Sequence, residues 1–209
     1  MSLEVQGLAV RRGDVALFAP LDLRVECGAV AVVMGPSGVG KSTLLDAIGG
    51  HLEHGFTCAG RVLVMGRDVT ALPAEARRIG VMFQDALLFP HLCLGDNLAF
   101  GLPAALRGRT ARRAAVEAAL AQAGLEGLYA RDPATLSGGQ KARAALMRAL
   151  LAEPQALLLD EPFSKLDAGL RAEMRSFVFG HVKARGIATL MVTHDPADAG
   201  AAGGAVVAL

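Results

Sequence analysis

The sequence predicts an α/β protein with a mostly parallel sheet, an antiparallel β subdomain and a helical subdomain. Short apolar runs that alternate with helical patterns are typical of parallel strands buried on both faces. Such runs occupy 30–34, 79–83, 156–159 and 188–193. Period-two alternation indicates antiparallel strands at 3–10 and 21–26, which 61–66 could join. Alanine-rich helical repeats from about 95 predict a helical subdomain, roughly 86–153.

Length and composition favour one domain spanning 1–209. The net charge of +1 gives no general attraction to nucleic acid, so we expect no such partner. No apolar stretch approaches the roughly 20 residues that cross a membrane, and the first residues lack the apolar segment of a secretion signal. Cys27, Cys58 and Cys93 are odd in number and far apart. We expect them to be reduced core thiols, which favours a cytosolic location.

Polar residues follow each of the predicted parallel strands. Gly35 follows the first run, Gln84 the second, Asp160 and Glu161 the third, and His194 the fourth. Open parallel sheets bind ligands just beyond the carboxyl ends of their strands. These residues therefore predict one site.

The first of these strand ends continues as GPSGVGKST, a phosphate-loop pattern rather than an ordinary glycine turn. Glycines let backbone N–H groups point at phosphate oxygens, lysine adds positive charge, and the next hydroxyl can ligate Mg²⁺. We expect ATP or a related nucleoside triphosphate here, on a P-loop NTPase core. The predicted binding residues are Gly35, Pro36, Ser37, Gly38, Val39, Gly40, Lys41, Ser42 and Thr43.

The two acidic residues after the third strand are expected to have separate roles in the chemistry. Asp160 can hold the metal through water, and Glu161 can orient and deprotonate the attacking water. The alternative is a solvent-exposed acidic turn, which the nearby phosphate loop disfavours. His194 is either a structural histidine or a contact to the γ-phosphate.

A second glycine pair lies in LSGGQ, residues 136–140. Ser137 and Gln140 have the spacing of a capping box, and an apolar stripe follows that predicts a helix ending before Pro154. Gly138 and Gly139 are poor helix formers, but they suit a close approach to the backbone. The stretch is therefore either a capped helix start or a second phosphate site.

These motifs together resemble those of ATP-binding cassette (ABC) ATPases. GPSGVGKST, Gln84, LSGGQ, ALLLDEP (156–162), SKLD (164–167) and His194 occur in the family's order and cover essentially the whole chain. The resemblance implies a head-to-tail homodimer with two ATP molecules between the protomers. Ser137, Gly138, Gly139 and Gln140 would then complete the ATP site of the partner.

The same resemblance assigns roles to the other motif residues. Glu161, His194 and Gln84 would be catalytic, and Ser42, Gln84 and Asp160 would hold Mg²⁺. Asp167 would lie in the loop that links the two sites. Gln84 would also couple nucleotide to the helical subdomain.

The stretch 83–103 resembles that of ATPases from importers that use a substrate-binding protein, of the thiamine, iron(III), molybdate and polyamine type. In those, this region helps form a groove for a short helix of the integral membrane permease. Phe89, Pro90 and Leu92 are therefore either a permease-facing surface or core. The expected partners are permease subunits and, through the complex, a periplasmic or extracellular substrate-binding protein. The expected location is peripheral, at the cytoplasmic face of the inner (cell) membrane.

Two features depart from the family pattern. Family members carry an aromatic residue near 11–13 that stacks on adenine, but this chain reads VRRGD. Arg12 could stack its guanidinium there, or Phe18 could reach in. The chain also ends without the extra domain of longer importer ATPases, so we expect no carboxyl-terminal regulatory domain. The cluster RGRTARR (107–113) favours a solvated helix start over an RNA or lipid site.

Two other function classes are compatible with parts of the sequence. A non-transport ABC ATPase, acting in DNA repair or on the ribosome, would normally show a coiled-coil insertion or two cassettes, and neither is present. A small-molecule P-loop kinase would explain the phosphate loop but not LSGGQ. The sequence therefore favours transport.

Overall fold

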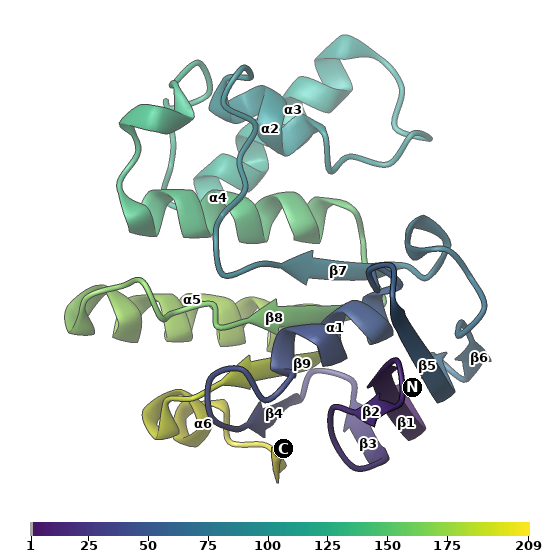
Figure 1. Ribbon diagram of the computed structural model, residues 1–209. Coiled ribbons are helices and arrows are strands. Elements are labelled where there is room, and N and C mark those ends of the chain that lie inside the picture. Colours follow the sequence, from purple (N-terminus) through teal and green to yellow (C-terminus); the bar gives the residue numbers. More distant parts are fainter. Residues whose placement is uncertain (1) are drawn as a thin grey trace.

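The computed structural model describes residues 2–209 and contains two sheets (Figure 1). The core sheet has the strand order β10-β4-β9-β8-β7, and each neighbouring pair is parallel. Its strands are β4 (Val30–Met34), β7 (Ile79–Met82), β8 (Ala156–Asp160), β9 (Ala188–Thr193) and β10 (Val206–Ala208). The four predicted parallel strands are confirmed, and β10 is added at the edge.

The second sheet is antiparallel and contains the predicted alternating strands. β1 lies between β5 and the two strands β2 and β3, and β6 pairs with β5. The strands are β1 (Ser2–Arg12), β2 (Val15–Ala16), β3 (Leu21–Glu26), β5 (Phe56–Val64) and β6 (Arg67–Asp68). Burial in β3 alternates strictly between buried and exposed, as its sequence pattern predicts.

The helices lie on both sides of the parallel sheet. Figure 1 shows α2 and α3 in a lobe above α4, which lies between that lobe and β7. The helices are α1 (Lys41–Gly49), α2 (Leu94–Ala99), α3 (Arg109–Gln122), α4 (Gly138–Leu151), α5 (Ala168–Arg185) and α6 (Pro196–Ala202), with 3₁₀ turns η1 (Ala74–Ala76) and η2 (Pro133–Thr135). The mixed α/β architecture predicted from the sequence is confirmed. None of the helices between residues 2 and 209 has the length and apolar character needed to cross a membrane.

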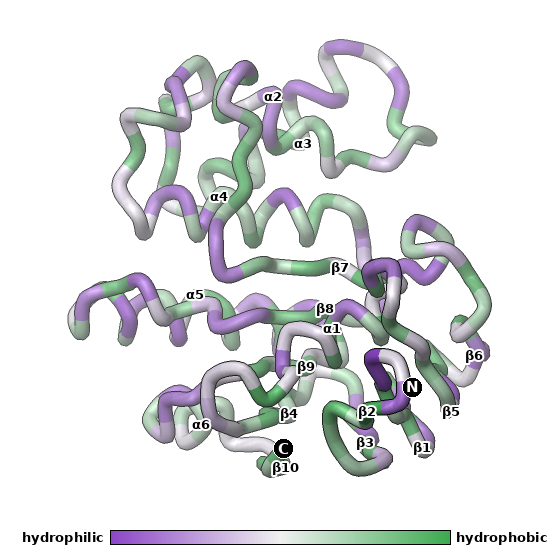
Figure 2. Tube along the Cα trace, viewed as in Figure 1, coloured by the Kyte–Doolittle hydropathy of each residue, from purple (hydrophilic) through white to green (hydrophobic). Residues whose placement is uncertain are grey.

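The parallel sheet separates two hydrophobic cores. Alternate side chains of β8 enter opposite cores: Leu157 and Leu159 pack toward α4 and α5, whereas Ala156 and Leu158 pack with α1 and the antiparallel sheet. Figure 2 shows the apolar character of these central strands. Burial on both faces explains why their sequences are continuous apolar runs.

Two surface features of the sequence have local explanations. The prediction that the cysteines are core thiols is wrong: Cys27 and Cys58 are exposed and Cys93 is partly buried, although all are free. Cys27 lies in a turn after β3, and Cys58 lies in the exposed first part of β5.

The basic stretch 107–113 starts helix α3, where Arg112 donates to backbone carbonyl oxygens and Arg113 pairs with Glu117.

Candidate nucleotide site

The loop between β4 and α1 has a backbone suited to binding an anion. Gly38 and Gly40 adopt left-handed angles, with φ of 84° and 104°, which side-chain-bearing residues rarely adopt. Gly40 is the N-cap of α1 and offers no capping side chain. The first N–H groups of this helix can therefore donate to a phosphate, with the positive end of the helix dipole behind them.

The ammonium group of Lys41 is fixed at this loop. Its Nζ donates to the carbonyl oxygens of Gly35 at 2.8 Å and Pro36 at 3.0 Å, and the residue is only 5% exposed. The same Nζ lies 3.6 Å from Oε1 of Glu161. A buried ammonium stabilises neighbouring negative charge strongly, and this one is held where a bound phosphate chain would meet it.

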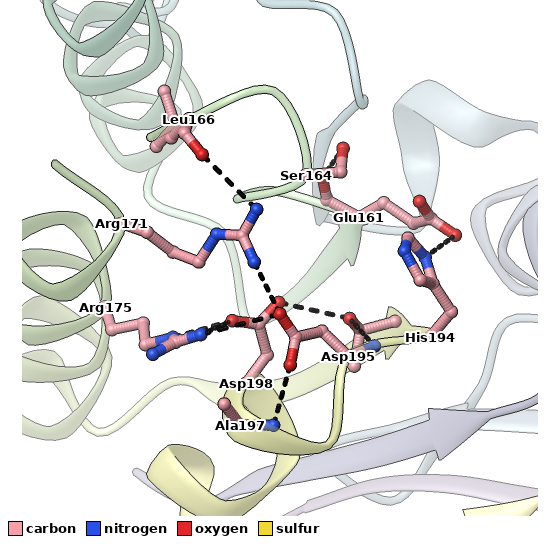
Figure 3. Close-up of polar contacts among 10 residues, drawn as sticks. Glu161, Ser164, Leu166, Arg171, Arg175, His194, Asp195, Ala197 and Asp198 are labelled. Atoms are coloured by element: carbon pink, nitrogen blue, oxygen red, sulfur yellow. Dashed lines mark hydrogen bonds and ion pairs between the residues drawn. The ribbon is translucent and has the colours of Figure 1, made fainter. Parts of the chain in front are cut away.

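Glu161 lies between Lys41 and His194. Its Oε1 is 3.1 Å from Nδ1 of His194, a contact drawn in Figure 3. Its backbone φ is 41°, unusual for a residue with a side chain. Such left-handed residues store backbone strain and cluster at active sites. The ends of β8 and β9 thus bring a carboxylate and an imidazole together, as their strand-end positions predict.

Asp160 and Ser42 lie beside this pair. Burial raises the pKa of the Asp160 carboxyl above its usual value, a hydrogen bond with Ser42 opposes this, and the charge of Glu161 adds to it. Desolvation disfavours the charged carboxylate, and a bound cation would relieve that penalty. Ser42, at the start of α1, and Asp160, at the end of β8, are both predicted oxygen ligands, and this hydrogen bond shows that they are adjacent.

Gln84 makes a different contact from the predicted metal contact. Its Nε2 donates to Oγ of Ser164 at 3.2 Å, and this hydroxyl donates to the carbonyl oxygen of Glu161 at 2.9 Å. Gln84 is therefore joined to Glu161 through one intermediate residue. Sequence reasoning missed Ser164 as a link, because nothing in the local pattern shows a contact between residues 80 positions apart.

LSGGQ forms the start of α4, with the predicted capping box. The N–H of Gln140 donates to Oγ of Ser137 at 3.3 Å, and the N–H of Ser137 donates to Oε1 of Gln140 at 3.0 Å. Within residues 2–209, no hydrogen bond or ion pair joins Ser137–Gln140 to the phosphate loop. The start of this helix is thus not bonded to the phosphate loop of its own chain.

Comparison with known proteins identifies the family. The sequence pattern of the family described as "ABC transporter" matches residues 18–164, which include the phosphate loop, LSGGQ and the acidic pair. The chain belongs to this family. It is accordingly an ATP-binding and ATP-hydrolysing protein, and the resemblance inferred from the motifs is confirmed.

Individual relatives agree with this assignment. The chain is 48% identical to the ABC transporter ATP-binding protein YnjD of Escherichia coli, over 93% of this chain and 89% of YnjD. It is 47% identical to the thiamine import ATP-binding protein ThiQ of Cereibacter sphaeroides, over 94% and 83%. Its fold matches that of the ATP-binding cassette MJ0796, solved as a dimer in a post-hydrolysis state with ADP and Pi. That match has a TM-score of 0.80 and 28% identity, and it covers 94% of this chain and 90% of MJ0796.

The end of β1, which we expect to meet the adenine base, carries an arginine and no aromatic residue. Phe18 is buried, at 9% exposure, and packs beneath Gly40, so it supports the phosphate loop instead of reaching out of it. Arg12 is exposed, with Cζ 5.6 Å from the ring centroid of Phe56. Sequence reasoning missed Phe56, which the antiparallel pairing of β1 with β5 places opposite Arg12.

Proposed function

We propose that the chain is the nucleotide-binding subunit of an importer and works as a head-to-tail homodimer that encloses two ATP molecules. One observation carries the dimer: Ser137 and Gly138 are exposed at the start of α4, yet within the described residues no hydrogen bond or ion pair joins LSGGQ to the phosphate loop of its own chain. A second copy, turned head to tail, would bring it to that loop. The dimeric state of MJ0796 and the role of ThiQ in thiamine import support this proposal.

In each proposed site, the residues have separate tasks. The backbone of 35–43 and the ammonium of Lys41 hold the phosphates. The carboxylate of Glu161 orients the attacking water and takes its proton, and His194 holds that carboxylate and contacts the γ-phosphate. The partner's Ser137–Gln140 segment then closes the site from the opposite side.

The donor set near the phosphate loop fits Mg²⁺. Ser42, Asp160 and Gln84 can each offer an oxygen ligand, which is the preference of this ion, and the partly buried Asp160 gains from a nearby cation. We assign these residues to Mg²⁺, with Gln84 leaving Ser164 to reach it. When bound, the ion supplies charge neutralisation on the phosphate oxygens.

A surface at the edge of the helical lobe suits a membrane partner. Phe100 is 70% exposed and Leu87 is 55% exposed, and the rings of Phe89 and Phe100 lie with centroids 4.9 Å apart. Pro90 is also exposed. We assign this apolar surface (Leu87, Phe89, Pro90, Phe100) to the permease, which places the chain peripherally at the cytoplasmic face of the membrane. A substrate-binding protein would join the complex through the permease. Within the single domain of this chain, we assign roughly residues 86–153 to the helical subdomain.

Copurification tests this function. The protein, expressed with a candidate permease, should be retained on the tagged permease, and transport into vesicles should require ATP hydrolysis. Phosphorylation of an added metabolite in place of simple hydrolysis would instead support a kinase. Retention on ribosomes or DNA in place of the permease would support a non-transport ATPase.

Asn97 should be essential for the apolar surface. Its fully buried amide donates to the carbonyl oxygens of Phe89, Leu92 and Cys93, each at 3.1 Å, and accepts from the N–H of Phe89 at 2.7 Å. Asn97→Ala leaves these groups unpaired, so we expect a loss of about 1–3 kcal/mol in the free energy of unfolding and weaker permease retention. Urea unfolding and the pull-down measure both. Gln122→Ala, an exposed amide on α3, should change neither; equal effects would contradict the assignment.

Arg12 should matter only for nucleotides that have a base. If its guanidinium stacks on adenine, Arg12→Ala should weaken ATP binding by about two- to fivefold, the equivalent of ~0.5–1 kcal/mol. The affinity for tripolyphosphate should stay unchanged. Arg11→Ala is the matched control, because the adjacent side chain points to the other face of β1. Competitive titration with both ligands measures the difference. Equal losses for ATP and tripolyphosphate would show that Arg12 acts through charge alone.

A further inference from the structure

Arg171, in the first turn of α5, joins two loops of the candidate site. Its Nη1 donates to Oδ2 of Asp195 at 2.5 Å, and its Nη2 donates to the carbonyl oxygen of Leu166 at 3.3 Å (Figure 3). The side chain is mostly buried. One guanidinium group, which is planar and rigid, therefore holds two separate segments at once.

Leu166 belongs to the loop that begins with Glu161. The N–H of Ser164 donates to the carbonyl oxygen of Glu161 at 3.2 Å, and the N–H of Leu166 donates to that of Phe163 at 3.2 Å. These turns make 161–166 a connected unit. A constraint on the carbonyl of Leu166 is therefore a constraint on the segment that carries the carboxylate of Glu161.

Asp195 directly follows His194 and is itself fixed on two sides. Its Oδ1 accepts from the N–H of Ala197 at 2.8 Å, and its own N–H donates to Oγ1 of Thr193 at 3.1 Å. The bond from Ala197, with the charges of two arginines, lowers the pKa of Asp195, so it stays a carboxylate for Arg171. The loop that carries His194 is thus connected to α5 through one ion pair.

A second arginine, Arg175, stabilises the segment that follows Asp195. Arg175 forms an ion pair with the buried Asp198, which also accepts from Oγ1 of Thr193. Arg171 itself has a buried Nε that lacks a partner within residues 2–209. A buried donor without a partner is unfavourable. The bonds from Nη1 to Asp195 and from Nη2 to Leu166 hold the guanidinium in this position.

We propose that Arg171 is a positioning residue for ATP hydrolysis, which ties the loop 161–167 to Asp195 and so keeps His194 in contact with Glu161. The proposal rests on the roles proposed above for Glu161 and His194. In the proposed dimer, the loop 161–167 lies between the two nucleotide sites. Arg171 therefore also gives that loop a direct connection to the histidine of its own chain.

Arg171→Gln tests the proposal, with Arg185→Gln as the matched control. Arg185 lies at the other end of α5 and likewise bonds one backbone carbonyl (Leu150) and one side chain (Gln122). We expect Arg171→Gln to lower kcat by roughly 10–100-fold, the scale of a misplaced catalytic group. The Kd for ATP should stay within about twofold, since no phosphate contact is lost. Unchanged kcat, or the same loss in Arg185→Gln, would overturn the proposal.

Asp195→Asn provides a second route if Arg171→Gln folds poorly. Asparagine keeps the acceptor for the N–H of Ala197, so the cap of α6 survives while the ion pair is lost. It should reproduce the loss in kcat, and Arg171→Lys should recover part of the activity. Wild-type turnover in Asp195→Asn would contradict a role through this pair.

A His194→Ala background shows whether Arg171 acts through the histidine. In single-turnover experiments with excess enzyme, Arg171→Gln should add no further loss to His194→Ala. A full additional loss would place the effect elsewhere and overturn the proposal. Near-normal turnover of His194→Ala alone would instead show that the proposed role of His194 has failed, so the two failures are distinguishable.

Discussion

Glu161→Gln should preserve ATP binding and lower turnover by at least about 10², the scale of lost general-base catalysis. Glutamine has nearly the same shape, so the strained backbone at φ 41° and the contact with His194 can persist. The amide cannot take a proton from water. It also removes the negative charge 3.6 Å from Lys41, which leaves that ammonium free for the phosphates. The variant should therefore accumulate as an ATP-bound dimer.

Phosphate release and size-exclusion chromatography with ATP and Mg²⁺ measure these two effects. Glu153→Gln is the matched control. Glu153 also has a left-handed backbone, with φ 50°, but it lies between α4 and the start of β8, whereas Glu161 follows the end of that strand. It should leave turnover unchanged. Near-normal hydrolysis by Glu161→Gln would remove Glu161 from the role of base.

The fold and most of the site could be predicted because the signals are local. Strands buried on both faces show as apolar runs, and the residues that follow them meet at one edge of the sheet by topology alone. The capping box of Ser137 and Gln140 is likewise a spacing of three. The terminal strand β10 escaped prediction because it is short and largely exposed, and so has no apolar run of buried length.

Contacts between distant residues could not be predicted in this way. Arg171 and Asp195 are 24 positions apart, and neither side chain differs in type from the many exposed charges of the chain. The cysteines misled for the opposite reason: free cysteine is usually buried, and only the turn at Cys27 and the open face at Cys58 expose these thiols. Composition predicts burial on average, whereas tertiary structure decides each position.

The dimer predicts a specific rescue between two inactive variants. Lys41→Ala removes the ammonium and its bonds to the phosphate loop, so it should weaken ATP binding itself, measurable by nucleotide titration. Ser137→Arg removes one half of the capping box and places a bulky cation where the glycine backbone must be approached closely. If each complete site needs Lys41 from one chain and Ser137–Gln140 from the other, either homodimer lacks one half of every site.

A mixed dimer of these variants distributes the defects unevenly. One of its sites collects both changes and the other collects neither, so mixing the two inactive proteins should restore ATP-dependent dimerisation, and hydrolysis where one intact site suffices. Dimerisation by size-exclusion chromatography is the primary readout, because coupling between the sites can suppress turnover. The control mixes two differently tagged copies of the same variant. Loss of the cap alone should cost only about 0.5–2 kcal/mol of stability and cannot be repaired by a partner chain. Rescue above the control would therefore require contact in trans, whereas its absence would leave LSGGQ as the cap of α4 and nothing more.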